Sequence, residues 1–184
     1  MKRTLCAVLS IALVFSLTPS QGQPKRKGTV CWPLHFAGIT VGLTTDSQAQ
    51  RLLGHGVFRS DEGHTGGRYF IDSKRTATLH IVEGVDTLIE ELTLSSGISR
   101  KIAVTERSAA VSKWLDPREG FGNWHALNLG SSKDEVLANL GEPQKRETRN
   151  KWIYESTCSC ELPEYLTLTF SQDRVSEINL FAGE

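Results

Sequence analysis

Apolar and polar positions follow a helical spacing most clearly in the second half of the chain, between residues 132 and 140. Three apolar side chains recur there at intervals that bring them onto one helix face. Ser132 and Glu135 have the spacing of a capping box, in which each side chain accepts a hydrogen bond from the other residue's backbone amide. Gly141 and Pro143 are residues that end helices. The pattern predicts a short helix from 132 to 140.

A second segment with the same kinds of residue at the start and the end of a helix begins at Thr45. Thr45 and Gln48 repeat the capping box, and Gly54 repeats the glycine at which the helix ends. The strand-like segments that end the two halves also correspond, at 91–97 and 177–183. This recurrence predicts two tandem units, and two unrelated helices with common punctuation are the alternative.

Outside these segments, apolar positions mostly alternate with polar ones, which is the pattern of half-buried β-strands. Glycine-rich and charged turns separate the alternating segments. We expect strands at 68–72, 76–82 and 87–94, an additional strand at 98–105, and strands at 144–156, 165–171 and 175–181.

These elements predict an α+β fold of two tandem units, each a short helix or helix pair packed on an antiparallel β-meander. The first unit would span residues 36–104 and the second residues 125–184, with a helix-containing linker at 105–124. A half-buried sheet with helices on one face is the architecture that this implies.

Residues 1–22 have the layout of a secretory signal peptide. Two basic residues precede an apolar stretch at 4–17, and the small residues Ser20 and Gly22 follow it. The stretch is shorter than the ~20 residues that a membrane-spanning helix needs. We therefore expect an exported protein, periplasmic or secreted, without stable membrane insertion after cleavage. Residues 23–35 would form a flexible leader.

The charge balance narrows the class of partner. The chain has 21 basic and 21 acidic residues, so it has no basic excess of the kind that binds nucleic acid. A hydrophobic content of 39% is enough for a packed core. We expect no nucleic-acid partner.

The cysteines that follow the signal segment are candidates for a disulfide, because exported proteins meet an oxidising compartment. They are Cys31, Cys158 and Cys160. A bond between Cys158 and Cys160 would close a very small, strained ring, so Cys31 with either of them is the favoured pairing. The spacing is not the Cys-x-x-Cys of redox catalysts.

Histidines in glycine-rich loops are the main candidates for chemistry. His55 and His64 could converge with Asp61 or Glu62 in a metal-dependent hydrolase, although no ligand spacing of a known zinc motif is present. Solvated loop histidines are the simpler interpretation. Nucleophile-elbow, phosphate-loop and dinucleotide-binding motifs are all missing. We predict no catalytic residue, no metal ligand and no cofactor.

Aromatic residues leave two interpretations open. Trp152 and Tyr154 share one face of a strand, and Ile153 between them takes the other face, where charged residues flank it. This favours Trp152 and Tyr154 in the core, because aromatic burial dominates small cores. In the alternative, these two residues and Tyr69 anchor a partner on an open sheet surface.

The second half also resembles a known group. Gly-Ser-Ser-x-x-x-Val-x-x-x-Leu-Gly-x-Pro at 130–143, then Trp-x-Tyr at 152–154, then an alternating strand and hairpin, is similar to β-lactamase-inhibitor-like units and to the SmpA/OmlA (BamE-like) outer-membrane assembly lipoproteins. Residues 128–181 carry the resemblance and 39–97 carry it more weakly. It implies a helix–meander fold and protein binding, but its motifs are structural and transfer no binding residue. The lipidated cysteine of the lipoproteins has no counterpart here.

The function predicted from these observations is an exported, non-catalytic protein-binding module of the cell envelope or secreted space. Its protein partner is not identified by the sequence. The alternatives are the small metal-dependent hydrolase that would use His55, Asp61 and His64, and a purely structural envelope protein.

Overall fold

The computed structural model describes residues 35–60, 66–112, 127–155 and 164–182. The signal segment, the leader up to residue 34 and most of the predicted linker lie outside these residues. The described elements are β1 (His35–Phe36), β2 (Ile39–Thr40), α1 (Asp46–Leu53), β3 (Val57–Arg59), β4 (Gly67–Ile71), β5 (Ala77–Glu83), β6 (Ile89–Ser96), the 3-10 helix η1 (Val104–Glu106), α2 (Lys133–Leu140), β7 (Lys145–Thr148), β8 (Lys151–Glu155), β9 (Glu164–Ser171) and β10 (Arg174–Ala182).

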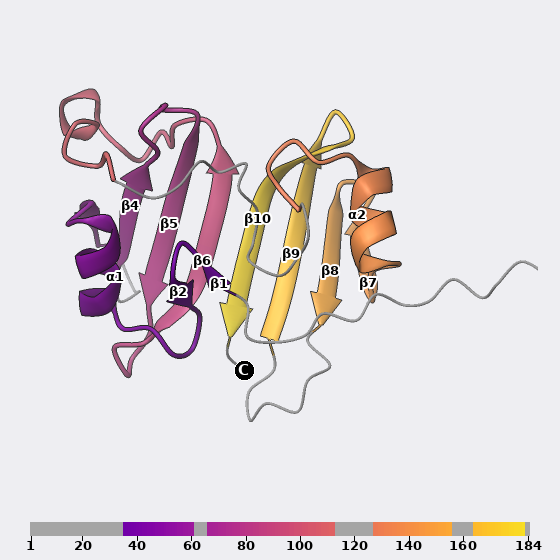
Figure 1. Ribbon diagram of the computed structural model, residues 1–184, viewed down its shortest axis with the longest axis horizontal. Coiled ribbons are helices and arrows are strands. Elements are labelled where there is room, and N and C mark those ends of the chain that lie inside the picture. The colour runs from indigo at the N-terminus through magenta and orange to yellow at the C-terminus, as the bar shows by residue number, and fades with distance from the viewer. Residues whose placement is uncertain (1–34, 61–65, 113–126, 156–163, 183–184) are drawn as a thin grey trace, which may run out of the picture.

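Eight strands form one antiparallel sheet in the order β3-β4-β5-β6-β10-β9-β8-β7 (Figure 1). Strands from the two halves of the chain meet near its middle, where β6 pairs with β10. Leu92 lies opposite Leu180 in this pairing, and Leu94 lies opposite Ile178. Backbone hydrogen bonding therefore continues without a break from one half of the chain to the other.

The predicted α+β fold of two tandem helix–meander units is therefore wrong. The two α-helices have only eight residues each, and strands of both halves share one sheet and one core. The physical reason lies at the inner edges of the two halves. A strand left at an edge exposes unpaired backbone groups, and pairing β6 with β10 removes two such edges at once. Local periodicity contains no information about this long-range choice.

Both α-helices begin at the predicted capping residues. Gln48 N donates to Thr45 Oγ1 at 3.2 Å, and Thr45 N donates to Gln48 Oε1 at 2.8 Å. Ser132 and Glu135 form the same pair of bonds, at 3.2 and 2.6 Å. Gly141 follows α2 with φ 75°, a conformation that favours glycine. The two capping boxes are confirmed.

Removing the second cap gives a direct test of its contribution. We expect Ser132→Ala to lower the free energy of unfolding by about 1 kcal/mol, because the Glu135 amide loses its acceptor. Chemical denaturation measures this change. Ser171→Ala is the matched control, since Ser171 is exposed at the end of β9, and it should change stability by less than about 0.5 kcal/mol. Equal effects of the two substitutions would contradict the assigned cap.

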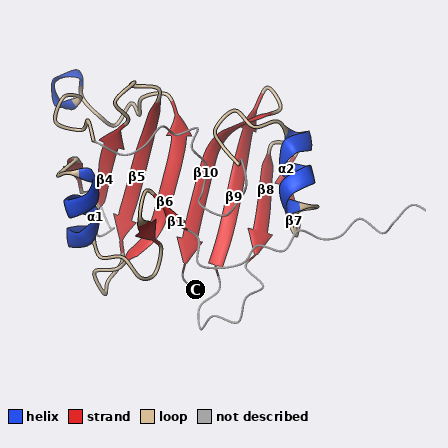
Figure 2. Ribbon diagram, in the orientation of Figure 1, coloured by secondary structure: helices blue, strands red, loops and turns tan. Residues whose placement is uncertain are grey.

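One face of the sheet carries the main core. Figure 2 shows α1 near β4 at one end of the sheet and α2 near β8 at the other end, with the β1–β2 hairpin between them. The core joins residues of all these elements, including Leu53 of α1, Ile39 of β2 and Val136 of α2. Side chains of the central strands, such as Leu92 and Leu180, are fully buried beneath them. None of the described helices has the length and apolarity needed to cross a membrane.

The opposite face, called the open face below, is covered only in part. Tyr69 and Ile71 of β4 pack there with Ile102 and Ala110, which come from the segment after β6. That segment turns back over β4 and contains η1, so the additional strand predicted at 98–105 is wrong. The rest of the open face carries mainly polar residues of β6, β10 and β9 that are only half-buried.

Candidate functional site

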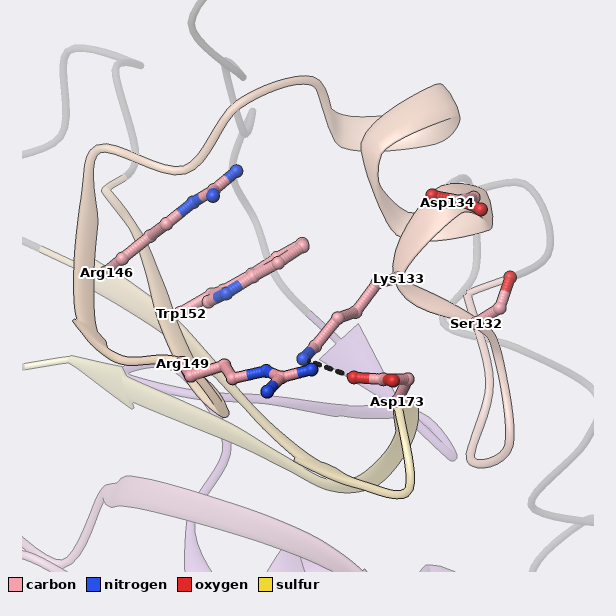
Figure 3. A pocket seen from close by; sticks show the side chains of 7 residues that line it. All are labelled: Ser132, Lys133, Asp134, Arg146, Arg149, Trp152 and Asp173. Atoms are coloured by element: carbon pink, nitrogen blue, oxygen red, sulfur yellow. Dashed lines mark hydrogen bonds and ion pairs between the residues drawn. The ribbon is translucent and has the colours of Figure 1, made fainter.

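A cleft of about 410 Å³ lies where the start of α2 meets the β7–β8 and β9–β10 turns (Figure 3). We call it the basic cleft. The start of α2, the β7–β8 hairpin and the β9–β10 turn supply its lining residues, which are Ser132, Lys133, Asp134, Arg146, Arg149, Trp152 and Asp173.

The floor of the basic cleft is the indole of Trp152. The Trp152 side chain is 4% exposed, and its ring packs at 58° against Phe170 with 4.6 Å between centroids. The Arg146 guanidinium lies 4.8 Å from the indole centroid, and Lys133 Nζ lies 5.9 Å from it. Both distances are within the range of cation–π attraction. The buried ring therefore helps to hold two positive groups at the surface of the cleft.

Three cationic side chains line the basic cleft: Lys133, Arg146 and Arg149. The first two form ion pairs with carboxylates. Lys133 Nζ donates to Asp173 Oδ1 at 2.6 Å and to Asn150 Oδ1 at 3.2 Å. Arg146 Nη2 donates to Glu142 Oε2 at 2.5 Å. The hydrogen bond from Lys133 holds the pKa of Asp173 below its usual value, and the positive charge of Arg149 acts in the same direction.

Arg149 differs from the other two cations. It lies in the β7–β8 turn and lines the cleft, but it forms no hydrogen bond or ion pair with any described residue. A guanidinium group offers several N–H donors in a planar fork that matches a carboxylate or a phosphate. The unused donors of Arg149 are therefore the part of the cleft best able to take an added anionic group.

The start of α2 does not itself provide an anion site. Lys133 N donates to Asp173 O at 3.1 Å, and Glu135 N donates to the Ser132 hydroxyl. These bonds occupy amides that a bound anion would otherwise need. The affinity of the cleft for an anion must come from the side chains of Arg146, Arg149 and Lys133.

A second hollow, of about 400 Å³, lies between α1 and the turn of the β1–β2 hairpin. Leu43 and Leu52, which are 65% and 52% exposed, contribute apolar surface to it. Arg51 is the one charged residue among its described lining residues. The hollow lacks the converging charges of the basic cleft, so the basic cleft is the stronger candidate.

The structure buries the aromatic residues that the sequence offered as partner anchors. Tyr154 is fully buried, and its hydroxyl donates to Gly141 O at 3.0 Å; burial raises its pKa. Tyr69 is 3% exposed and stacks on His80 with 4.1 Å between ring centroids. Only Trp152 reaches the basic cleft, as its floor. Ile153 lies on the open face opposite Lys145, as its charged neighbours indicated.

Of the remaining residues singled out from the sequence, the structure describes His55. His55 lies in a described loop, where its Nδ1 is 3.1 Å from Gln50 Oε1. Asp61, Glu62 and His64 lie outside the described residues, as do Cys31, Cys158 and Cys160. Within the described ranges, no group of three His, Cys, Asp or Glu residues could hold a metal ion.

Sequence reasoning missed the charged residues of the basic cleft. It treated 144–156 as one strand, whereas the chain forms two, β7 and β8, joined by a turn at Arg149 and Asn150. Asparagine favours turns, and three further basic residues lie at 145, 146 and 151. These two signals together could have indicated a basic hairpin.

Comparisons with known proteins add little to this geometry. No protein-family model matches the sequence, and no curated protein sequence matches it. Among solved structures, the crystal structure of a DUF4309 family protein (YjgB) from Bacillus subtilis is similar over 79% of this chain and 82% of that chain, with a TM-score of 0.48 and 14% sequence identity. The resemblance to β-lactamase-inhibitor-like and SmpA/OmlA units stays a prediction from the sequence.

Proposed function

We propose that this chain is an exported, non-catalytic binding protein that holds an acidic segment of another protein in the basic cleft. The observation that carries the proposal is Arg149, a guanidinium that forms no hydrogen bond or ion pair with a described residue and interacts only through its charge with Asp173. It lines the same cleft as Arg146 and Lys133. The expected export rests on the signal-like residues 1–22.

The shape of the cleft favours a carboxylate over a flat ring as the bound group. Nucleobases and sugars bind by stacking on an exposed aromatic face, but Trp152 is only 4% exposed and Arg146 lies against its ring. A carboxylate needs no such face. It can bind the outer N–H groups of Arg149 while Asp173 keeps its bond to Lys133. Aspartate and glutamate side chains of a partner supply this group.

Loss of the unpaired guanidinium should weaken binding of an acidic peptide. We expect Arg149→Ala to raise the Kd for a glutamate-rich peptide about fivefold, the order of effect of one exposed charge pair. The effect should shrink with added salt, because the pair is open to solvent. Isothermal titration calorimetry with a synthetic peptide measures both quantities.

Lys145→Ala provides the matched control. It removes the same charge from the same hairpin, but Lys145 is 66% exposed on the open face, opposite Ile153. It should leave the Kd within about a factor of two, since an exposed charge on the far face is screened from the cleft. Equal increases in Kd for the two variants would show that the peptide responds to the overall charge of the hairpin and does not bind in the basic cleft. A peptide that binds neither variant nor the wild type would overturn the proposed function.

A further inference from the structure

Strand β7, at the edge of the sheet, lies next to the basic cleft and contributes Arg146 to it. We propose that the acidic segment binds as an added antiparallel or parallel strand along β7, with its carboxylates directed into the cleft. This inference rests on the proposed function and names the conformation of the partner segment. It is carried by the backbone edge of β7 and by the way the cations are paired on the two faces of the β7–β8 hairpin.

The backbone edge of β7 is open to a partner. Among the described strands, β7 ends the sheet and pairs only with β8, and all four of its residues are exposed. A strand in this position leaves one row of N–H and C=O groups without a strand partner. Extended peptides bind other proteins by adding a strand to such an edge.

The other edge of the same sheet is less suited to this role. β3 has only three residues, and the segment after β6 packs on part of it. Arg59 of β3 forms an ion pair with Glu106 of that segment, and its Nε donates to Lys101 O at 3.4 Å. The edge at β7 has no such cover among the described residues.

The pairing of the charges of the hairpin differs between its two faces. On the open face, Glu147 accepts from Lys151 at 2.7 Å and lies 4.0 Å from Lys145, so these cations share a carboxylate. On the cleft face, Arg146 is paired with Glu142. Arg149 forms no hydrogen bond or ion pair with a described residue, and only its charge acts on Asp173. Among these residues, each face of the hairpin therefore carries one more cation than carboxylate. Only the extra cation of the cleft face, Arg149, has no ion pair among the described residues.

Charged edge strands often serve to prevent association, because two like-charged edges repel each other. The same charge makes the edge selective, since it disfavours a second copy of β7 and attracts a strand of opposite charge. In an added strand, alternate side chains point to the same face and lie roughly 7 Å apart. A segment with acidic residues at alternate positions directs all of its carboxylates to one face, and in the proposed register this is the cleft face, where both Arg146 and Arg149 lie.

The test uses a peptide of about six residues, a usual strand length, in which glutamate and threonine alternate. Two further peptides of the same sequence carry N-methyl groups on alternate backbone amides, one on the odd and one on the even positions. In a paired strand, only alternate amides point toward the neighbouring edge. We expect one of the methylated peptides to lose about tenfold in affinity and the other to bind like the parent. At saturation, amide exchange should slow in Lys145–Thr148 and stay unchanged in Val57–Arg59.

Each outcome has a distinct meaning. If both methylated peptides bind like the parent, or both are weakened equally, the strand pairing is wrong and the acidic cleft of the proposed function stands. If the parent peptide does not bind, both proposals fail. A peptide with lysine in place of glutamate should not bind, and comparable binding of it would also contradict the role of the cleft cations. Arg149→Ala should weaken the parent peptide without changing which methylated peptide is impaired.

Discussion

Replacing Leu180 with alanine should lower the free energy of unfolding by about 3 to 4 kcal/mol, because a fully buried leucine that is truncated leaves a cavity as well as losing apolar contacts. Leu180 is completely buried. It lies opposite Leu92 of β6 on one side and Leu166 of β9 on the other. The substitution therefore weakens the junction at which the two halves of the chain join.

The distribution of the loss is as informative as its size. If the eight strands form one cooperative sheet, amide exchange should accelerate in β4 and β8 alike, since exchange of core amides follows global unfolding. If the halves were independent, only one set of amides would change. Thr167→Ala is the control, because Thr167 is half-buried on the open face of β9 and should cost less than about 1 kcal/mol. Chemical denaturation and hydrogen exchange on the same samples give both measurements.

The sequence was informative about elements that local chemistry determines. Capping boxes at Thr45 and Ser132 act over three residues, so the start of each helix could be predicted without any knowledge of the fold. The alternation at 152–154 likewise assigned Trp152 and Tyr154 to the core and Ile153 to the other face. These features depend on residues that are neighbours in the chain.

Features that depend on distant residues were missed. The pairing of β6 with β10 joins residues such as Leu94 and Ile178, and nothing in either strand distinguishes an edge from an interior position. The same problem affected the candidate site, because Arg149 reaches the cleft only after the chain reverses between β7 and β8. The charged residues in 144–156 are equally compatible with one exposed strand and with a hairpin of two strands. The basic cleft could therefore be recognised only from the structure.

Glu164 is a second residue whose environment could not be read from the sequence. It is the first residue of β9 and lies opposite Ala182 of β10. Its side chain shares a face with Leu166 and is 5% exposed. The Oε2 atom has no hydrogen-bond partner among the described residues. Burial raises the pKa of this carboxyl from 4.5 to about 8, because a charge without a partner is costly away from water.

The raised pKa makes stability depend on pH in a defined direction. The folded chain holds the proton of Glu164 more tightly than the unfolded chain does, so the full contribution of the protonated carboxyl is present below about pH 4.5. That contribution declines as the pH rises through the interval from 4.5 to about 8, and it is lost above this interval. The displacement from 4.5 to about 8 is about 3.5 pKa units and corresponds to roughly 5 kcal/mol, which sets the largest expected loss.

Glu164→Gln should remove this dependence, since an amide of nearly the same shape carries no titrating proton. We expect the variant to be as stable as the wild type near pH 4.5 and to be more stable by up to about 5 kcal/mol at pH 8 or above. Urea denaturation across this interval measures the difference. Glu155→Gln removes an exposed carboxyl of β8 and should leave the slope of stability with pH unchanged. If Glu164→Gln kept the wild-type slope, the buried carboxyl would not be the group that titrates, and the unpartnered oxygen at the start of β9 would need a different explanation.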